Sequence, residues 1–300
     1  MKVRCFGSLN IDYVYQVEHF VKKGETIASS DLQVFCGGKG LNQALALAKA
    51  GCPVTFAGKL GEDGAFLLET LQEAGVDISL VKISEQVRTG NAIIQIDESG
   101  DNCIMLYGGA NQTISKADVD EILQNFQAGD YLVLQNEISE ISYIIEQAKQ
   151  KQLIIVLNPS PINQALLTYP LNLVDILILN EHEGRALLAT ELDETESLLA
   201  ALQTQYPHTK IVLTLGAAGS QYSDGELSII QEAYQAQVRD TTAAGDSFSG
   251  FFLAALIKGE KPKQAMNLAA KAAAITVSRP GAAVSIPTLQ EVLAAEFPHE

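Results

Sequence analysis

The chain has 300 residues, of which 47% are hydrophobic, and this is enough to build a sizeable core in one large domain. Its 20 basic and 36 acidic residues give a net charge of -16, which repels nucleic-acid phosphates and anionic membrane surfaces. The first ten residues lack the apolar segment of a secretory signal, and no apolar run reaches membrane-spanning length. We therefore expect a cytoplasmic protein that binds neither nucleic acid nor membranes.

Short apolar segments alternate with helical segments along most of the chain. The strand-like segments lie at residues 3–9, 54–60, 131–135, 153–158, 175–180 and 210–216, and the first helical segments at 41–51 and 65–75. Continuous apolar strands between helices are typical of a parallel sheet that is covered on both faces. We therefore predict an α/β protein with three layers, α/β/α, around a mainly parallel central sheet.

Two segments interrupt this alternation, at residues 11–35 and about 88–109. Both alternate polar and apolar residues, and turn signals lie within each of them. We predict that they form a small separate sheet inserted in a single domain of residues 1–300. Such a sheet near the ligand end of the core is expected to be a lid, with a plain extension of the sheet edge as the alternative.

The small sheet is also expected to need a partner surface. Its apolar positions alternate with polar ones and are expected to be exposed to solvent. Examples are Val14, Val17, Ile94 and Ile96.

Polar residues follow the predicted strands, at the edge where open parallel sheets bind ligands. Asn10 and Asp12 follow the first strand in GSLNID, and Glu137 follows the strand YLVLQ. Short amides and carboxylates suit the recognition of hydroxyl groups. Asn and Asp also form turns, so these positions alone are weak indicators of a site.

The segment CGGKGLNQA places Gly38, Lys39 and Asn42 at the start of a helix. Glycines let a ligand approach the backbone, and the Lys and Asn side chains supply donors. The segment is not a Walker loop, because no Ser or Thr follows Lys39, and it does not satisfy G-x-G-x-x-G. A tight turn that packs the helix on the sheet is the alternative.

Asn180 and Glu183 belong to the segment NEHE, which follows another strand. One histidine without the H-E-x-x-H spacing argues against zinc, and water-mediated Mg²⁺ binding fits better. Solvated acids at a helix start are the alternative. The later segment TLGAAGS places glycines after Thr214, where a purine can lie against the backbone or where an ordinary β-turn forms.

The segment DTTAAGDSFSG places Asp246 at the start of an apolar helix, directly after Ala243, Ala244 and Gly245. Helix starts favour anions because their first amides have no internal partner. The simplest interpretation makes Asp246 a helix N-cap. The N-cap interpretation leaves the two alanines and the glycine before Asp246 unexplained.

Together these motifs resemble the ribokinase branch of the PfkB sugar kinases, over essentially the whole chain and in the family's order. The matching segments are GSLNID, GGKGLNQA, GGAN, LNPSP, NEHE, TLGAAGS and DTTAAGDSFSG. The resemblance implies a ribokinase-like fold with a β-sheet lid and a homodimer formed through paired lids. It implies ATP-dependent transfer of the γ-phosphate to the primary 5-hydroxyl of D-ribose. Deoxyribose, fructose or adenosine as substrate, or a sugar-binding sensor without turnover, stay open.

The resemblance also implies roles for individual residues. Asp246 would be the general base, beside an anion hole formed by the amides of Ala243, Ala244 and Gly245. The implied sugar ligands are Asn10, Asp12, Gly38, Lys39, Asn42 and Glu137. The implied nucleotide contacts are Asn180, Thr214, Gly216 and Gly219, and Glu183 would organise Mg²⁺ through water. An activating K⁺ would lie at Asp240, Thr242, Thr276, Arg279, Gly281 and Ser285. Pro280 replaces a residue that commonly donates there, and it stiffens this loop.

Overall fold

The computed structural model describes residues 2–190 and 195–297. Within these residues a nine-stranded central sheet has the order β13-β12-β11-β10-β9-β8-β1-β4-β5. Its strands are β1 (Val3–Phe6), β4 (Val54–Gly61), β5 (Asp77–Ser84), β8 (Tyr131–Gln135), β9 (Ile154–Asn158), β10 (Ile176–Asn180), β11 (Lys210–Thr214), β12 (Ser220–Ser223) and β13 (Ser228–Gln231). The strands from β5 to β11 pair in parallel, and β12 and β13 extend the sheet with antiparallel pairings.

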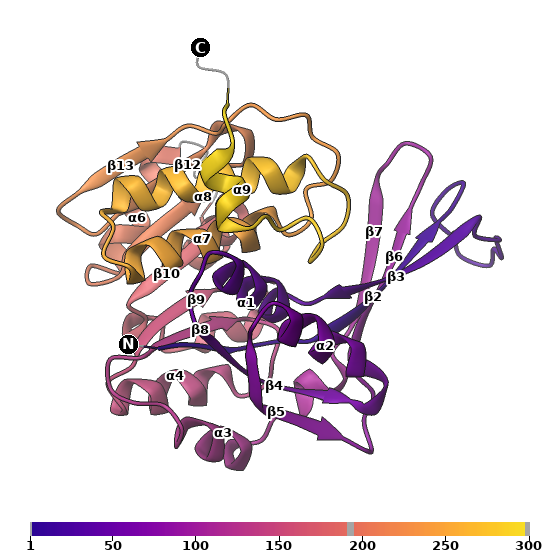
Figure 1. Cartoon of the computed structure of the whole chain (residues 1–300), viewed down its shortest axis with the longest axis horizontal. Helices are drawn as coiled ribbons and strands as arrows, with labels where there is room; N and C mark the ends of the chain where they lie inside the picture. The colour runs from indigo at the N-terminus through magenta and orange to yellow at the C-terminus, as the bar shows by residue number, and fades with distance from the viewer. Residues whose placement is uncertain (1, 191–194, 298–300) are drawn as a thin grey trace.

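Helices cover both faces of this sheet (Figure 1). They are α1 (Lys39–Lys49), α2 (Ala65–Glu73), α3 (Lys116–Leu123), α4 (Ile141–Gln150), α5 (Glu181–Leu188), α6 (Thr195–Gln205), α7 (Ala244–Ile257), α8 (Pro262–Val277) and α9 (Leu289–Ala294). Short 3₁₀ helices are η1 (Glu62–Gly64), η2 (Gly109–Thr113), η3 (Gln164–Thr168), η4 (Leu171–Leu173) and η5 (Gly216–Ala218). Among the described helices, none combines the length and apolar character that a membrane crossing requires.

Alternate residues of the inner parallel strands enter two separate hydrophobic cores. In β10, Ile176 and Ile178 pack with the helices α1, α2, α7, α8 and α9, whereas Leu177 and Leu179 pack with α3, α4, α5 and α6. Side chains of a strand point to opposite faces, so a strand buried on both faces must be apolar throughout. The predicted α/β/α layers and mainly parallel sheet are confirmed.

A small separate sheet projects from the core beside α1 and α2 (Figure 1). Its strand order is β3-β2-β6-β7, with β2 (Asn10–Gln16), β3 (Asp31–Gly37), β6 (Gly90–Ile96) and β7 (Asn102–Tyr107). The chain leaves the central sheet at the end of β1 and enters the small sheet at Asn10. The junction between the two sheets therefore carries the first group of predicted site residues. The presence of the small sheet is confirmed.

The exposed face of the small sheet was predicted wrongly. Val17 is buried, and Val14, Ile94 and Ile96 are half-buried and line a cavity between the two sheets. The reason is the register, which pairs Val14 with Ile94 and turns both side chains toward the core. The exposed apolar side chains of this sheet are Leu32, Val34, Ile104, Met105, Leu106 and Tyr107.

Candidate active site

A cavity of about 890 Å³ lies at the carboxyl ends of the parallel strands, between the central sheet and the small sheet. Open parallel sheets bind ligands at this edge. The predicted site residues that line it are Asn10, Asp12, Gly38, Lys39, Asn42, Glu137, Asn180, Glu183, Thr214, Asp240, Thr242, Ala243, Gly245, Asp246 and Gly281. The fold thus brings together residues from both ends of the chain.

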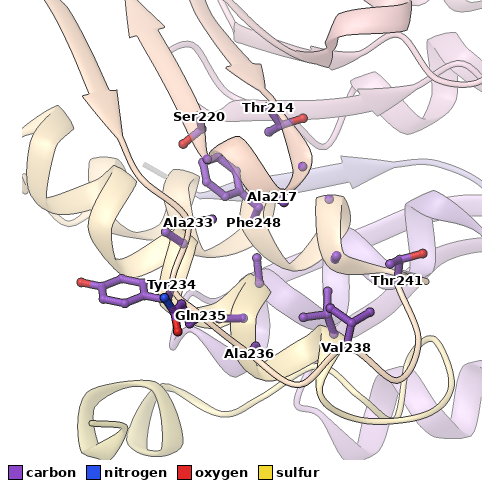
Figure 2. Close-up of a pocket in the computed structure, with 18 residues that line it drawn as sticks. Thr214, Ala217, Ser220, Ala233, Tyr234, Gln235, Ala236, Val238, Thr241 and Phe248 are labelled. Atoms are coloured by element: carbon purple, nitrogen blue, oxygen red, sulfur yellow. The ribbon is translucent and has the colours of Figure 1, made fainter. Parts of the chain in front are cut away.

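A second cavity, of about 620 Å³, lies between the β11–β12 turn and the helices α7 and α8. Figure 2 shows Thr214 and Ser220 on one side of it and Ala236 and Val238 on the other. Gly216, Gly219 and Ala244 also line it, together with apolar side chains such as Phe248. The cavity therefore offers backbone and apolar surface, which suits a flat heterocyclic ring.

The two cavities meet at the N-terminus of α7. Thr214, Val238, Thr241 and Gly245 line both of them. A group held in one cavity can therefore approach a group held in the other at Gly245. Asp246 is the next residue in the chain, and it lines the first cavity.

The glycines before α1 serve two purposes. A Cβ added to Gly37 would lie 2.1 Å from Oδ2 of Asp12, so glycine makes room for that carboxylate. Gly38 has φ +94°, a conformation that favours glycine. A Cβ added to Gly40 would lie 2.3 Å from the backbone nitrogen of Ser8, so this glycine packs the helix on the strand. The packing alternative holds for Gly40, whereas Gly37 makes room for the carboxylate of Asp12, which lines the cavity.

Glu137 caps helix α1 from another part of the chain. Its Oε2 accepts hydrogen bonds from the hydroxyl of Ser8 and from the backbone N–H of Lys39, the latter at 2.9 Å. Gly38, the N-cap, has no side chain to do this. Burial raises the pKa of Glu137, and Lys39 partly opposes that rise. The carboxylate is therefore fixed beside Lys39 at the helix start.

Lys39 is the positive centre of the cavity. Burial by itself lowers the pKa of Lys39, but the carboxylates of Asp246, Glu137 and Glu183 outweigh this effect and raise it. The ammonium group thus stays charged among three acids. It is placed to attract an anionic ligand group to the first cavity.

Asp12 lies on the cavity face of β2. Burial and the nearby charge of Glu137 raise the pKa of Asp12 from 3.8 to about 7. Both effects disfavour the ionised carboxylate, since it loses water and faces a like charge. A ligand that donates hydrogen bonds to Asp12 would therefore favour its ionised form.

Asp246 is not the N-cap that the sequence suggested. The N-cap of α7 is Ala243, with φ 61°, and Asp246 is the third residue of the helix. Its Oδ2 accepts a hydrogen bond from Nδ2 of Asn42 at 3.1 Å, and its Oδ1 accepts one from Nε2 of Gln43 at 2.9 Å. The carboxylate is thus held by α1 rather than by the first amides of its own helix.

The backbone at Gly245 borders open space, whereas the N–H of Ala244 donates to the carbonyl of Thr241 at 3.3 Å. A Cβ added to Gly245 would meet no atom within 4 Å. The amides of the first helical turn have no partner within the helix, and they carry the positive end of its dipole. The backbone at Gly245 is therefore accessible from both cavities, at a helix start of the kind that favours anions.

Asn180 and Glu183 form a reciprocal capping box at the start of α5. Glu183 Oε1 and Oε2 accept hydrogen bonds from the side chain and the backbone of Asn180, at 3.0 and 2.9 Å. Glu183 is only 6% exposed, so it is not a solvated acid. Thr214, on the neighbouring strand β11, donates to the carbonyl of Leu179.

The residues expected around a monovalent ion divide into two groups. Asp240 bridges two loops, because its Oδ1 accepts from the N–H of Thr242 and its Oδ2 from the N–H of Gly281, both at 2.9 Å. These bonds lower the pKa of Asp240 against the effect of its burial. The remaining side chains bond elsewhere: Thr276 to Ser247 and Ala272, Ser285 to Ala282, and Arg279 to Glu291.

Comparison with known proteins shows to which family the chain belongs. The model of the pfkB family carbohydrate kinases matches residues 1–289. The chain belongs to this family. A ribokinase of Haemophilus influenzae is 36% identical over 293 residues, which cover 96% of this chain and 95% of the relative. The resemblance inferred from the motifs is confirmed, and the protein is a carbohydrate kinase.

Solved ribokinase structures have the same fold. A ribokinase of Arabidopsis thaliana, complexed with ribose and ATP, has a TM-score of 0.86 and 32% identity, and the match covers 97% of each chain. A ribokinase of Cryptococcus neoformans in complex with ADP has a TM-score of 0.84 and 34% identity, with 97% and 98% covered. The predicted ribokinase-like fold class is confirmed.

Two buried amides of this carbohydrate kinase were missed by the sequence reasoning. Asn111 donates through Nδ2 to Oδ1 of Asn10 at 2.8 Å, and it also pairs with the backbone of Leu9. It therefore fixes the side chain of Asn10. Gln43 holds Asp246, as described above. Their positions in GGAN and GGKGLNQA were the available signals, but neither motif says which buried group each amide meets.

Proposed function

We propose that this kinase transfers the γ-phosphate of ATP to the 5-hydroxyl of D-ribose and forms ribose 5-phosphate. The observation that carries the proposal is the meeting of the two cavities at Gly245, directly before Asp246. A sugar in the first cavity and a nucleotide in the second would face each other there. The ribokinase relative and the ribokinase complexed with ribose and ATP support this assignment.

The sugar would lie among the polar residues of the first cavity. Asp12 and Glu137 accept hydrogen bonds from hydroxyl groups, and Lys39 and Asn42 donate them. Oδ1 of Asn10 accepts a hydrogen bond from Asn111, so the amino group of Asn10 would donate to the sugar. The backbone of Gly38 allows close approach. Half-buried apolar residues of the small sheet would cover the sugar ring, as a lid does.

Asp246 would act as the general base. It takes the proton of the 5-hydroxyl while that oxygen bonds to the γ-phosphorus and the bond to the β-phosphate oxygen breaks, releasing ADP. The first amides of α7 from Ala243 to Gly245 would hold the phosphoryl oxygens, and Lys39 would offset their negative charge. Phosphoryl transfer depends mainly on such positioning and charge.

The nucleotide would occupy the second cavity. Its apolar wall and the backbone at Gly216 and Gly219 suit a purine ring. Thr214 lines both cavities, and Asn180 lines the first one close to it. These two residues would therefore lie along the phosphate chain.

The donor set fits Mg²⁺ bound through water. In the part of the chain that the structure describes, no group of three or more His, Cys, Asp or Glu side chains could hold a metal ion directly. Glu183 is buried, lines the cavity and has both oxygens committed to Asn180, so its contact with Mg²⁺ would be indirect. Bound Mg²⁺ would offset phosphate charge, and it usually keeps several waters.

K⁺ would lie beside the anion hole. The side chains of Thr276, Ser285 and Arg279 bond to other protein groups, so they would contribute backbone carbonyls or indirect support. Asp240 already joins the loop before α7 to the loop at Gly281. A cation there would stiffen both loops without touching the sugar.

We also propose a homodimer in which two small sheets pack together, and we place the reaction in the cytoplasm, where ATP is supplied. All six residues of β7 are exposed, and four of them are the large apolar residues Ile104, Met105, Leu106 and Tyr107. An exposed apolar edge strand favours pairing with another surface.

The proposed function is tested by measuring ADP release with ribose, deoxyribose, fructose and adenosine as acceptors. We expect the highest kcat/KM with ribose. A higher value for another acceptor would reassign the substrate. Ribose binding without ADP release from any acceptor would instead indicate the sugar-binding sensor.

A further inference from the structure

We propose that Gln43 and Gln135 position Asp246 and leave its Oδ2 as the atom that accepts the proton. We call these two residues the glutamine relay. The inference rests on the proposed role of Asp246 as general base. The relay would not touch the sugar or the nucleotide, and it would act only through the carboxylate.

The relay is a chain of buried hydrogen bonds. Nε2 of Gln135 donates to Oε1 of Gln43 at 2.7 Å, and Nε2 of Gln43 donates to Oδ1 of Asp246 at 2.9 Å. Gln43 is 1% exposed and Gln135 is fully buried. Burying two amides costs stability, and Oε1 of Gln135 has no partner among the described residues. Apolar side chains would fill this space at a lower cost in stability. The hydrogen-bonded glutamines therefore indicate a role beyond packing.

The order of donors fixes the orientation of each amide. An amide side chain has one donating and one accepting end, and a carboxylate only accepts. Because Asp246 only accepts, Gln43 turns its amino group toward the carboxylate and its Oε1 toward Gln135, which donates to it. Without Gln135, the buried Oε1 of Gln43 would lose its donor, and Asp246 alone would hold the amide of Gln43.

Gln135 itself is held in a narrow slot of the core. A Cβ added to Gly7 would lie 2.2 Å from Oε1 of Gln135, so glycine is required beside the amide. Nε2 of Gln135 also lies 3.9 Å from the sulfur of Cys5. The far end of the relay thus lies at the end of β8, beside the neighbouring strand β1 of the main sheet.

The two oxygens of Asp246 have different surroundings. Asn42, which lines the first cavity, donates to Oδ2, whereas the fully enclosed Gln43 donates to Oδ1. A carboxylate oxygen has two lone pairs, so Oδ2 can accept from Asn42 and still receive the proton of a hydroxyl. Gln43 then prevents the carboxylate from rotating away from the cavity.

The relay is tested with Gln43→Leu and Gln135→Leu. We expect Gln43→Leu to lower kcat about 10-fold to 100-fold, because a small misplacement of a reacting group costs about that much. KM for ribose should stay within about twofold, since the relay does not contact the sugar in this scheme. Gln135→Leu should give a smaller loss of kcat in the same direction. In an Asp246→Asn background, neither change should lower kcat further.

A structural glutamine provides the matched control. Gln203 of α6 donates to the carbonyls of Tyr206 and Thr209, far along the chain from the site. Gln203→Leu should lower the melting temperature without lowering kcat. If Gln43→Leu does not fold, the same kcat comparison is made with Gln135→Leu, which lies one step farther from Asp246.

The possible outcomes distinguish the positioning role of the glutamine relay from the proposed base role of Asp246. Wild-type kcat in both Leu variants, beside a large loss in Asp246→Asn, would overturn the relay and leave the base role intact. A further loss when Gln43→Leu is added to Asp246→Asn would also overturn it, since Gln43 would then act independently. An Asp246→Asn variant that keeps more than about a tenth of kcat would overturn the base role itself.

Discussion

Gly250 lies directly against Ala46, because a Cβ added to Gly250 would come within 2.3 Å of the Cβ of Ala46. This close approach joins the backbones of α7 and α1 one helical turn beyond Asp246. It brings Asn42 and Gln43 within hydrogen-bond distance of that carboxylate. The site therefore depends on a helix contact between the two ends of the chain.

The two glycines of α7 should respond oppositely to substitution. Gly245→Ala should fold normally and gain up to about 1 kcal/mol in unfolding free energy, since its Cβ meets no protein atom and alanine favours helix. Its kcat should fall about 100-fold, because the methyl group obstructs the amides proposed to hold phosphate. Gly250→Ala should lose about 1 to 3 kcal/mol of stability through overpacking. Thermal melts and ADP release measure both effects, and an unchanged kcat in Gly245→Ala would contradict the anion hole.

Asp246→Asn should separate catalysis from stability. We expect kcat to fall by roughly 10² to 10⁴, the range for a lost general base. The melting temperature should stay close to that of the wild type. Oδ1 of Asn42 has no partner among the described residues, so this amide can reverse and accept from the new amino group. A variant with near-native kcat would reduce Asp246 to a structural carboxylate.

Ribose affinity should depend on pH through Asp12. Its pKa of about 7 in the folded protein means that the carboxyl is largely protonated below pH 7. The ionised form accepts stronger hydrogen bonds from hydroxyl groups. Calorimetry without ATP should therefore show tighter ribose binding at pH 8 than at pH 6. The Asp12→Asn variant should bind more weakly and show little of this dependence, and equal pH dependence in both proteins would argue against Asp12.

The same shift affects the stability of the ribose-free protein, with a defined sign. Between pH 3.8 and about 7, folded Asp12 holds a proton that the unfolded chain has released. The contribution of Asp12 to stability therefore falls as the pH rises through this window, and it stays low above pH 7. Asp12→Asn should remove this part of the pH dependence in thermal melts. Its melting temperature should exceed that of the wild type at pH 8 more than at pH 5.

Potassium should raise the turnover rate above that in sodium or Tris buffer. The carboxylate of Asp240 joins the loops at Thr242 and Gly281, and a cation there would support the start of α7. Rates are measured with saturating Mg²⁺ and ribose. Asp240→Asn should reduce the response to potassium. Equal rates in potassium, sodium and Tris buffers would argue against the ion site. Pro280, which replaces a residue that commonly donates in this loop, would then be the first position to test.

The protein should sediment as a dimer at micromolar concentration. Met105 and Leu106 are exposed on opposite faces of β7, and the changes Met105→Glu and Leu106→Glu identify the face that is covered. One of them should shift the protein toward monomer. Ile230→Glu is the control, because Ile230 is equally exposed on β13, the edge strand of the central sheet. A wild-type monomer under these conditions would refute the dimer.

The central architecture follows from local sequence patterns. Strands such as β10 are apolar at every buried position, because both of their faces are covered, and this pattern is local. The sequence also located most of the candidate site. Asp12, Lys39, Glu137 and Asp246 follow strands or begin helices, and parallel strands bring those points to one edge of the sheet.

The assembly of the candidate site depends on contacts between segments that are distant in the chain. Gln43 and Asp246 are 203 residues apart, and their hydrogen bond exists because α1 packs on α7. Ala243 takes the left-handed conformation that makes it the N-cap, although local preference favours Asp246. The sequence likewise did not determine which face of the small sheet is buried, because both faces carry apolar residues. Pairing of β2 with β6 turned Val14 inward, and the strand register that sets this depends on contacts distant in the chain.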